Sequence, residues 1–272
     1  MGGALRRFRE NLGYSLEDAA QILECDRSKI SRIENGQRGI RGKELRELLA
    51  EYGIDGQQQA ILVAMADSRG ARGWYGANTD VLPSAYQDYL LFEAGASRVS
   101  VYEAQRIPAL LQTPAYARAL AETNPEFADD EARDKAVAVT LARQKTILGE
   151  HKPDIHLIIG EAALQQEVGG STVMEGQLGL LAGVGGGNDT ITVQILPFSS
   201  GAHPAADIGS MSILRFSQAP GLGAVHLGGV SGGICLENQA DLATYARMFK
   251  QLRKSALSPA QSALLLRGQK VS

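Results

Sequence analysis

Residues 15–36 read SLEDAAQILECDRSKISRIENG, and this stretch decides the fold of the first part of the chain. Two short helical patterns flank a three-residue turn, Glu24-Cys25-Asp26. Ser15 and Asp26 favour the N-cap position, so each is expected to start one of the two helices. Apolar residues recur at the spacing of one buried helix face: Leu16, Ala19, Ala20, Leu23, Ile30 and Ile33. Two short helices joined by a tight turn predict a helix-turn-helix domain.

The flanking sequence predicts a bundle of about five helices around this pair. An amphipathic first helix is expected to end near Gly13, because glycine is favoured just past a helix C-terminus. A fourth helix follows Gly42-Lys43, and a fifth covers about 57–66. The first domain is therefore expected to span residues 1–67.

The motif SxISRxENG, present as residues 28–36, resembles the signature of Cro/lambda-repressor (XRE) regulators. The resemblance covers about residues 4–66. In such domains the helix after the turn enters the major groove, where each base pair presents a distinct pattern of donors and acceptors. The resemblance therefore implies binding to a double-stranded DNA operator. One departure is Leu16, which stands where the family commonly has a Gln that contacts a phosphate.

Matching this motif residue by residue predicts a DNA-binding surface. Its members are Arg27, Ser28, Lys29, Ser31, Arg32, Asn35 and Arg38. Arg27, Ser28 and Arg32 are expected at base edges, whereas the last two members follow the helix and are expected to meet the DNA backbone. An arginine can donate two hydrogen bonds to guanine, which contributes about 1–3 kcal/mol of discrimination.

Other charged residues of the first domain have simpler explanations than DNA contact. Glu34 is expected to form a salt bridge within the domain. Arg6, Arg7 and Arg9 favour a solvated face over a DNA contact.

A second domain is expected to follow the Gly-rich linker at 68–73, and it covers residues 74–272. Helices are predicted at about 84–97, 114–122, 129–149, 171–184 and 239–256, with a short one that opens at Ser258-Pro259. Strands are predicted at about 155–159, 190–197, 210–216, 222–230 and 233–237. The expected fold is an all-α helix-turn-helix domain joined to a larger α+β domain with a mostly antiparallel sheet.

Several segments of this second domain form a recognisable set. They include IPALLQT at 107–113, RQ at 143–144, EAAL at 161–164 and LPF at 196–198. Together they resemble the effector domain, of unknown function, of a large group of actinomycete XRE-type regulators. The chain departs from that pattern at Ala109, at Gln165 and Gln166, and at His226-Leu227-Gly228. If these residues line a pocket, the ligand or partner of this protein differs from those of its relatives.

Polar residues that lie among apolar neighbours in or near these motifs are candidates for an effector pocket. They are Glu93, Tyr102, Gln112, Arg143, Glu161 and His203. An alternative is that Tyr102, Gln112 and Arg143 only hold loops in place.

Composition sets limits on the function. The 272 residues carry a net charge of −3, and no apolar run approaches the roughly 18 residues that span a bilayer, so a cytoplasmic protein without membrane contact is expected. Residues 1–50 hold ten Lys and Arg against eight Asp and Glu. This mild excess gives one copy weak DNA affinity, and a homodimer on paired half-sites is therefore expected.

No catalytic, cofactor-binding or metal-binding residues are expected, and the protein is not predicted to be an enzyme. The four His and two Cys form no compact set of metal ligands. The Gly-rich run at 183–187 follows a helix and precedes a strand, whereas a phosphate-binding loop follows a strand and precedes a helix.

The leading hypothesis is a sequence-specific transcription regulator whose second domain senses a small ligand or a partner protein. The alternative is an interaction hub controlled by a small companion protein, and an enzymatic second domain is a distant third.

Overall fold

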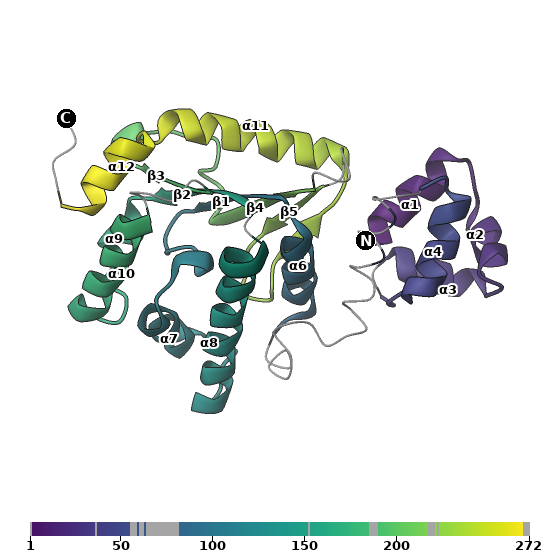
Figure 1. The fold of residues 1–272 in the computed structure, drawn as a ribbon, viewed down its shortest axis with the longest axis horizontal. Helices are drawn as coiled ribbons and strands as arrows, with labels where there is room; N and C mark the ends of the chain where they lie inside the picture. The colour runs from purple at the N-terminus through teal and green to yellow at the C-terminus, as the bar shows by residue number, and fades with distance from the viewer. Residues whose placement is uncertain are drawn as a thin grey trace.

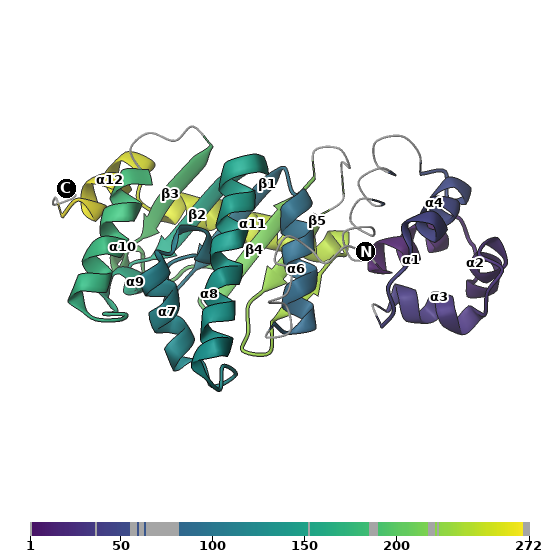
Figure 2. The same cartoon turned by 60° about the horizontal axis from the view of Figure 1, so that its bottom comes forward.

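The computed structural model describes residues 2–35, 37–54, 59, 63, 82–151, 153–184, 190–216, 221 and 223–268. Apart from residues 59 and 63, the predicted fifth helix lies outside these ranges. The predicted linker at 68–73 and the domain boundary at residue 74 also lie outside them. Figures 1 and 2 show the two parts of the chain, a set of N-terminal helices and a larger α/β domain.

The N-terminal part contains four described helices. These are α1 (Gly2–Asn11), α2 (Leu16–Ile22), α3 (Arg27–Glu34) and α4 (Gly42–Glu51). Ser15 caps α2 as expected: its hydroxyl accepts the Asp18 N–H at 3.1 Å, and its own N–H donates to the Asp18 carboxylate at 2.7 Å. Asp26 occupies the N-cap position of α3 as expected, but its side chain makes no cap hydrogen bond.

A buried ion pair ties α1 to α3. Arg9 donates from Nε and Nη2 to the two carboxylate oxygens of Glu34, at 2.7 and 2.8 Å, and both residues are buried. This confirms the predicted salt bridge of Glu34. The predicted solvated face is wrong for Arg9, whose guanidinium is buried. The Glu34 carboxylate compensates its positive charge, which lowers the cost of removing the guanidinium from water. This ion pair thereby fixes α3 against α1.

The turn between α2 and α3 contains a strained residue. Glu24 has φ +46°, in the left-handed region, where a side chain costs about 1–2 kcal/mol. Glycine adopts this region without that cost, although it loses more chain entropy on folding. We expect Glu24→Gly to raise the free energy of unfolding of the first domain by up to about 1 kcal/mol.

Urea unfolding of the full chain, followed by a probe in the first domain, measures this effect. Glu17→Gly is the matched control, because the same change within α2 should destabilise the domain by about 0.5–1 kcal/mol. Destabilisation of similar size by both variants would contradict the prediction.

The second domain is built on one sheet of six described strands. They are β1 (Arg98–Glu103), β2 (Asp154–Gly160), β3 (Ile191–Leu196), β4 (Ser210–Arg215), β5 (Gly223–Leu227) and β6 (Ile234–Leu236). Their order is β3-β2-β1-β4-β5-β6. β1 lies near the middle of the sheet but is absent from the predicted elements, because its Arg, Ser and Glu interrupt the apolar run typical of a central strand.

The sheet is mixed, so the expectation of a mostly antiparallel sheet is wrong. β1, β2 and β3 run parallel, whereas the β1–β4, β4–β5 and β5–β6 pairs are antiparallel. Parallel neighbours need a long crossover connection, and the helices predicted at about 114–122, 129–149 and 171–184 supply these connections. Those helices are α7 (Pro114–Thr123), α8 (Asp130–Gln144) and α10 (Ser171–Val184).

The remaining helices include α6 (Ser84–Gly95), α9 (Ala162–Gln165), α11 (Gln239–Ser255) and α12 (Pro259–Leu266). Short 3-10 turns occupy Ala109–Leu111 and Phe198–Ser200. The predicted helix at 129–149 ends its α-helical part at Gln144 and continues as a π-helix over Lys145–His151.

Two apolar layers cover the sheet, one on each face. Side chains alternate between faces along a strand, so Val101 and Leu157 pack toward α6, α7, α8 and α10, whereas Tyr102 and Ile158 pack toward α11. Figure 1 shows α11 lying along one face and α6, α7, α8, α9 and α10 gathered on the opposite face. Phe249 and Leu252 of α11 complete the second layer.

Candidate functional site

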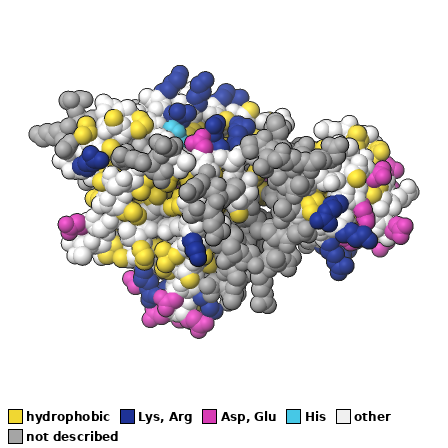
Figure 3. Space-filling model, in the orientation of Figure 1, with side chains coloured by type: hydrophobic (Ala, Val, Ile, Leu, Met, Phe, Trp, Pro, Cys, Tyr) yellow, Lys and Arg dark blue, Asp and Glu magenta, His cyan; other side chains and the backbone are white. Residues whose placement is uncertain are grey.

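The first candidate surface is the exposed side of α3. Arg27, Ser28 and Arg32 are exposed, as predicted for residues that reach DNA. Arg27 forms an exposed ion pair with Glu17 at 3.0 Å, and the Arg32 Nε donates to the Ser28 carbonyl at 3.1 Å. These are weak surface interactions that DNA can replace. Figure 3 shows Lys and Arg side chains gathered near α3.

The other predicted DNA-binding residues differ in exposure. Asn35 and Arg38 are exposed, and Ser31 is half-buried. Lys29 is held by Glu44 on α4 at 2.8 Å, with 17% of its side chain exposed. Lys29 therefore braces α3 against α4 in addition to any contact with DNA.

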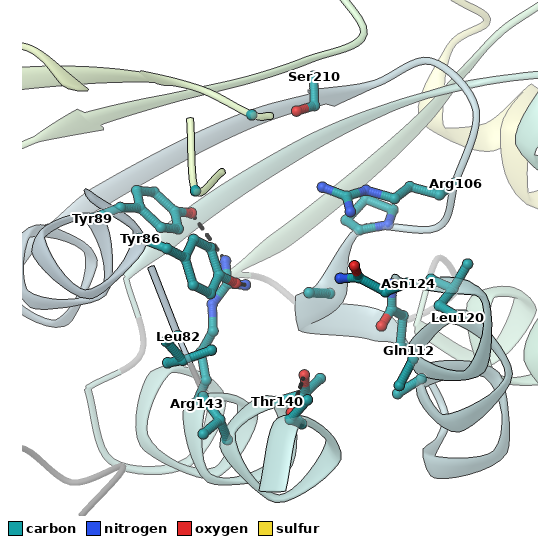
Figure 4. A pocket seen from close by; sticks show the side chains of 18 of the residues that line it. Leu82, Tyr86, Tyr89, Arg106, Gln112, Leu120, Asn124, Thr140, Arg143 and Ser210 are labelled. Carbon is teal, nitrogen blue, oxygen red and sulfur yellow. Dashed lines mark hydrogen bonds between the residues drawn. The ribbon is translucent and has the colours of Figure 1, made fainter. Parts of the chain in front are cut away.

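The second candidate site is a cavity of about 370 Å³ in the α/β domain. It lies between one face of the sheet and helices α6, α7 and α8 (Figure 4). The sheet contributes Val101, Glu103, Ser210, Ser212 and His226. The helices contribute Tyr86, Tyr89, Leu120, Val139, Thr140 and Arg143.

The strand order explains why a cavity forms here. β1 has β2 on one side, and the chain returns after β3 to place β4 on its other side. Glu103 at the carboxyl end of β1 lies opposite Ser210 at the start of β4. Both residues line the cavity, together with Val101, Ser212 and His226 on the same face of the sheet.

A buried polar network forms one wall of the cavity. Arg143 on α8 makes a bidentate pair with Glu93 on α6, with distances of 2.5 and 2.7 Å. Its guanidinium also donates to the hydroxyls of Tyr86, at 3.0 Å, and Tyr89, at 2.9 Å. Tyr89 in turn donates to Glu93 at 2.5 Å. These bonds satisfy two charges that would otherwise be costly to bury.

A second charged pair lies on the wall opposite the tyrosines (Figure 4). Arg106, in the loop after β1, donates to both carboxylate oxygens of Glu103, at 3.1 and 3.2 Å. Burial raises the pKa of the Glu103 carboxyl above its usual range, and the Arg106 guanidinium partly opposes that shift.

His226 on β5 lies between these two walls. Its ring stacks on Tyr89, with ring centroids 4.3 Å apart, and its Nε2 lies 2.8 Å from the Gly232 carbonyl oxygen. Burial lowers the pKa of the imidazole below its ordinary value of 6.5, although the hydrogen bond to Gly232 opposes the shift. The neutral ring is therefore favoured in the folded protein.

We expect the buried His226 to make this domain lose stability as the pH falls from about 7 to about 5, and the raised pKa of Glu103 to offset part of that loss. Below pH 6.5 the His226 imidazole binds a proton more readily in the unfolded chain than in the folded chain, because its pKa is lowered only in the folded chain. The neutral ring makes its full contribution to stability above pH 6.5. This contribution is lost as the pH falls toward the lowered pKa of the folded state.

The measurement is the urea midpoint at several pH values for the wild type and His226→Asn. The variant should lose less stability between the two ends of the range, although His156, whose pKa burial also lowers, keeps part of the dependence. Parallel curves for the two proteins would contradict the expected role of His226.

The loop between β5 and β6 needs glycine where it closes the cavity. Gly232 and Gly233 have φ of +95° and +77°. A Cβ atom on Gly232 would lie 2.6 Å from the Pro83 Cβ, and one on Gly233 would lie 2.1 Å from the Leu227 carbonyl oxygen. The backbone of this loop is thus packed directly against the start of α6.

The six candidate pocket residues divide between several places. Gln112 and Arg143 line the cavity, and Glu93 lies directly behind Arg143. Tyr102 faces the opposite side of the sheet, where its ring lies edge-on to His203, with centroids 6.1 Å apart. Glu161 accepts the Phe198 N–H at 2.7 Å and joins the ends of β2 and β3. The structure therefore does not bring Tyr102, Glu161 and His203 to this cavity.

Residues 86–268 match the family described as a domain of unknown function, DUF5753. The chain belongs to this family. Residues 1–61 match a helix-turn-helix domain, which confirms the predicted N-terminal module. No curated protein and no solved structure matches the chain. Among the described helices of this DUF5753 protein, none is long and apolar enough to cross a membrane.

The cavity contains residues at which the DUF5753 domain departs from the pattern expected for its relatives. Ala109, His226 and Gly228 line it, whereas Gln165 and Gln166 do not. The sequence analysis pointed to His226 only as one of these departures. No sequence pattern pointed to Arg106. Figure 4 shows Arg106 reaching over the cavity.

Proposed function

We propose that this DUF5753 protein is a sequence-specific transcription regulator whose second domain binds a small molecule in the cavity. The main support for this proposal is a cavity of about 370 Å³ between the sheet and its helices, in a chain whose residues 1–61 match a helix-turn-helix domain. Its volume lies in the range of small-molecule sites, and its wall combines apolar side chains with polar and charged ones. The proposal involves binding and no chemical step.

The DNA-binding half of the proposal rests on α3. Inserted into the major groove, the helix would bring Arg27, Ser28 and Arg32 to base edges. Asn35 and Arg38 would then meet phosphates, which position a protein on the duplex without reading its sequence. We propose a homodimer, because two half-sites one helical turn apart require a protein with two-fold symmetry.

Contacts at the start of α6 support a route from ligand to DNA. α6 is the first described element after the segment that joins the two domains. Leu82 and Pro83, just before it, and Tyr86 and Tyr89 on it, all line the cavity. A ligand that contacts these residues differently in two conformations shifts the balance between them, and with it the DNA affinity.

The experiment is selection of fragmented host DNA by the purified full chain, followed by binding to the best site over a series of salt concentrations. A palindromic site whose affinity falls steeply with salt supports the DNA-binding half. Compounds are then screened for release of that site. Absence of any enriched site would overturn the DNA-binding half, and in that case co-purification with a companion protein becomes the next measurement.

A matched variant tests the ligand half. Leu120→Trp places a larger side chain in the cavity and leaves α3 untouched. It should retain operator binding and lose the response to a releasing compound. A response equal to that of the wild type would place the ligand outside this cavity.

A further inference from the structure

The cavity presents one well-exposed charged side chain among the described residues that line it. The side chain of Arg106 is 54% exposed, compared with 10% for Glu103 and 6% for Arg143. The fully buried Glu93 balances Arg143. Among these charged groups, the guanidinium of Arg106 is therefore the most accessible to a ligand.

Arg106 retains donors for a ligand. A guanidinium has five N–H donors, and the two bonds to Glu103 use one on Nε and one on Nη2. The two hydrogen bonds to the Glu103 carboxylate orient the Arg106 guanidinium, so Glu103 is a positioning residue. Arginine in this geometry suits carboxylate, sulfonate and phosphate groups, because it can donate two parallel hydrogen bonds to them.

The rest of the wall suits a hydrocarbon or aromatic body. α7 and α8 contribute Ala117, Leu120, Ala121 and Val139, and Phe127 lies between these two helices. The rings of Tyr86 and Tyr89 lie across the cavity from Arg106, and Ser210 adds a hydroxyl near it (Figure 4). The site thus combines an exposed guanidinium, paired with Glu103, with a group of apolar side chains on and between α7 and α8.

Building on the proposed function, we propose that the ligand is an amphiphilic organic anion. Its anionic group is bound by the Arg106 guanidinium, and its apolar part lies between the sheet and helices α6, α7 and α8. A hydrophobic carboxylate, sulfonate or phosphate has this chemistry.

Two fluorescent probes that differ by one charged group test the proposal on the full chain. Anilinonaphthalene sulfonate is an aromatic anion, and N-phenylnaphthylamine is its neutral counterpart. The wild type should bind the anion roughly tenfold or more tightly than the neutral probe, because hydrogen bonds to charged groups are the stronger class. Arg106→Gln should raise the Kd of the anion roughly tenfold and leave that of the neutral probe unchanged.

Three further variants separate the outcomes. Arg106→Lys keeps the charge and should retain part of the preference for the anion, which covers the case in which Arg106→Gln fails to fold. Arg247→Gln removes an exposed arginine on α11, outside the cavity, and should change neither Kd. Leu120→Trp should weaken both probes.

The possible failures are distinct. Equal binding of the two probes, or anion binding that survives Arg106→Gln, would overturn the proposed ligand class while leaving the cavity as a ligand site. Binding of both probes that Leu120→Trp does not weaken would overturn the ligand site itself, and with it the sensing half of the proposed function.

Discussion

Replacing Glu93 by Gln is expected to lower the free energy of unfolding of the DUF5753 domain by about 3–5 kcal/mol. Glu93 is fully buried, and both of its carboxylate oxygens accept hydrogen bonds from Arg143. The amide offers one acceptor oxygen and no charge, so Arg143 would remain buried with its charge uncompensated. Such a loss corresponds to a fall in Tm of roughly 10 °C for a domain of this size.

Thermal and urea unfolding of the full chain measure this effect. Asp154→Asn is the matched control, because it removes the carboxylate of an exposed pair, Arg98–Asp154, and should cost less than about 1 kcal/mol. The double variant Glu93→Leu with Arg143→Met removes both charges and should recover part of the loss. Equal effects of Glu93→Gln and Asp154→Asn would show that the buried pair is not the source of stability.

Replacing Arg32 by Ala is expected to abolish specific operator binding while the protein remains folded. Arg32 is exposed on α3, and its Nε donates to the Ser28 carbonyl on the same helix. Loss of a bidentate contact to guanine costs about 1–3 kcal/mol per half-site, and a dimer loses it twice, or roughly 2–6 kcal/mol in all. The affinity for the operator should therefore fall by at least roughly 30-fold.

Competition between the selected operator and an unrelated duplex measures specificity directly. Arg32→Ala should lose the difference between the two duplexes and keep the weak, salt-dependent binding to both. Arg247→Ala, which removes an exposed arginine from α11, should behave as the wild type. Retention of full specificity by Arg32→Ala would show that α3 reads the operator through other residues.

The parts of the fold that could be predicted are those encoded locally. The spacing of Ile30 and Ile33 fixed the buried face of α3, and the run at 155–159 identified β2, because a strand buried on both faces is continuously apolar. The helix over 171–184 has the bounds expected from its sequence. β1 was not predicted, because polar residues alternate with its apolar ones and leave no continuous apolar run.

Strand direction and the cavity depend on pairings between distant segments. β1 pairs with β2 across about fifty residues, and no local pattern reports whether that pair is parallel. Glu93 and Arg143 could be marked as candidates, but the bond between them is a property of the folded chain. Arg106 could not be singled out, because its exposure inside a cavity is decided by the elements around it.

The separate apolar layers on the two faces of the sheet have a consequence for how this protein can change. None of the described residues that line the cavity comes from α11, so the layer formed by Tyr102, Ile158 and Phe249 stays intact when the cavity wall is altered. One face of the sheet can hold the domain together while the other acquires a new chemical preference. Substitutions confined to the cavity-lining residues of α7 and α8 are therefore expected to change the proposed ligand preference without disturbing that layer.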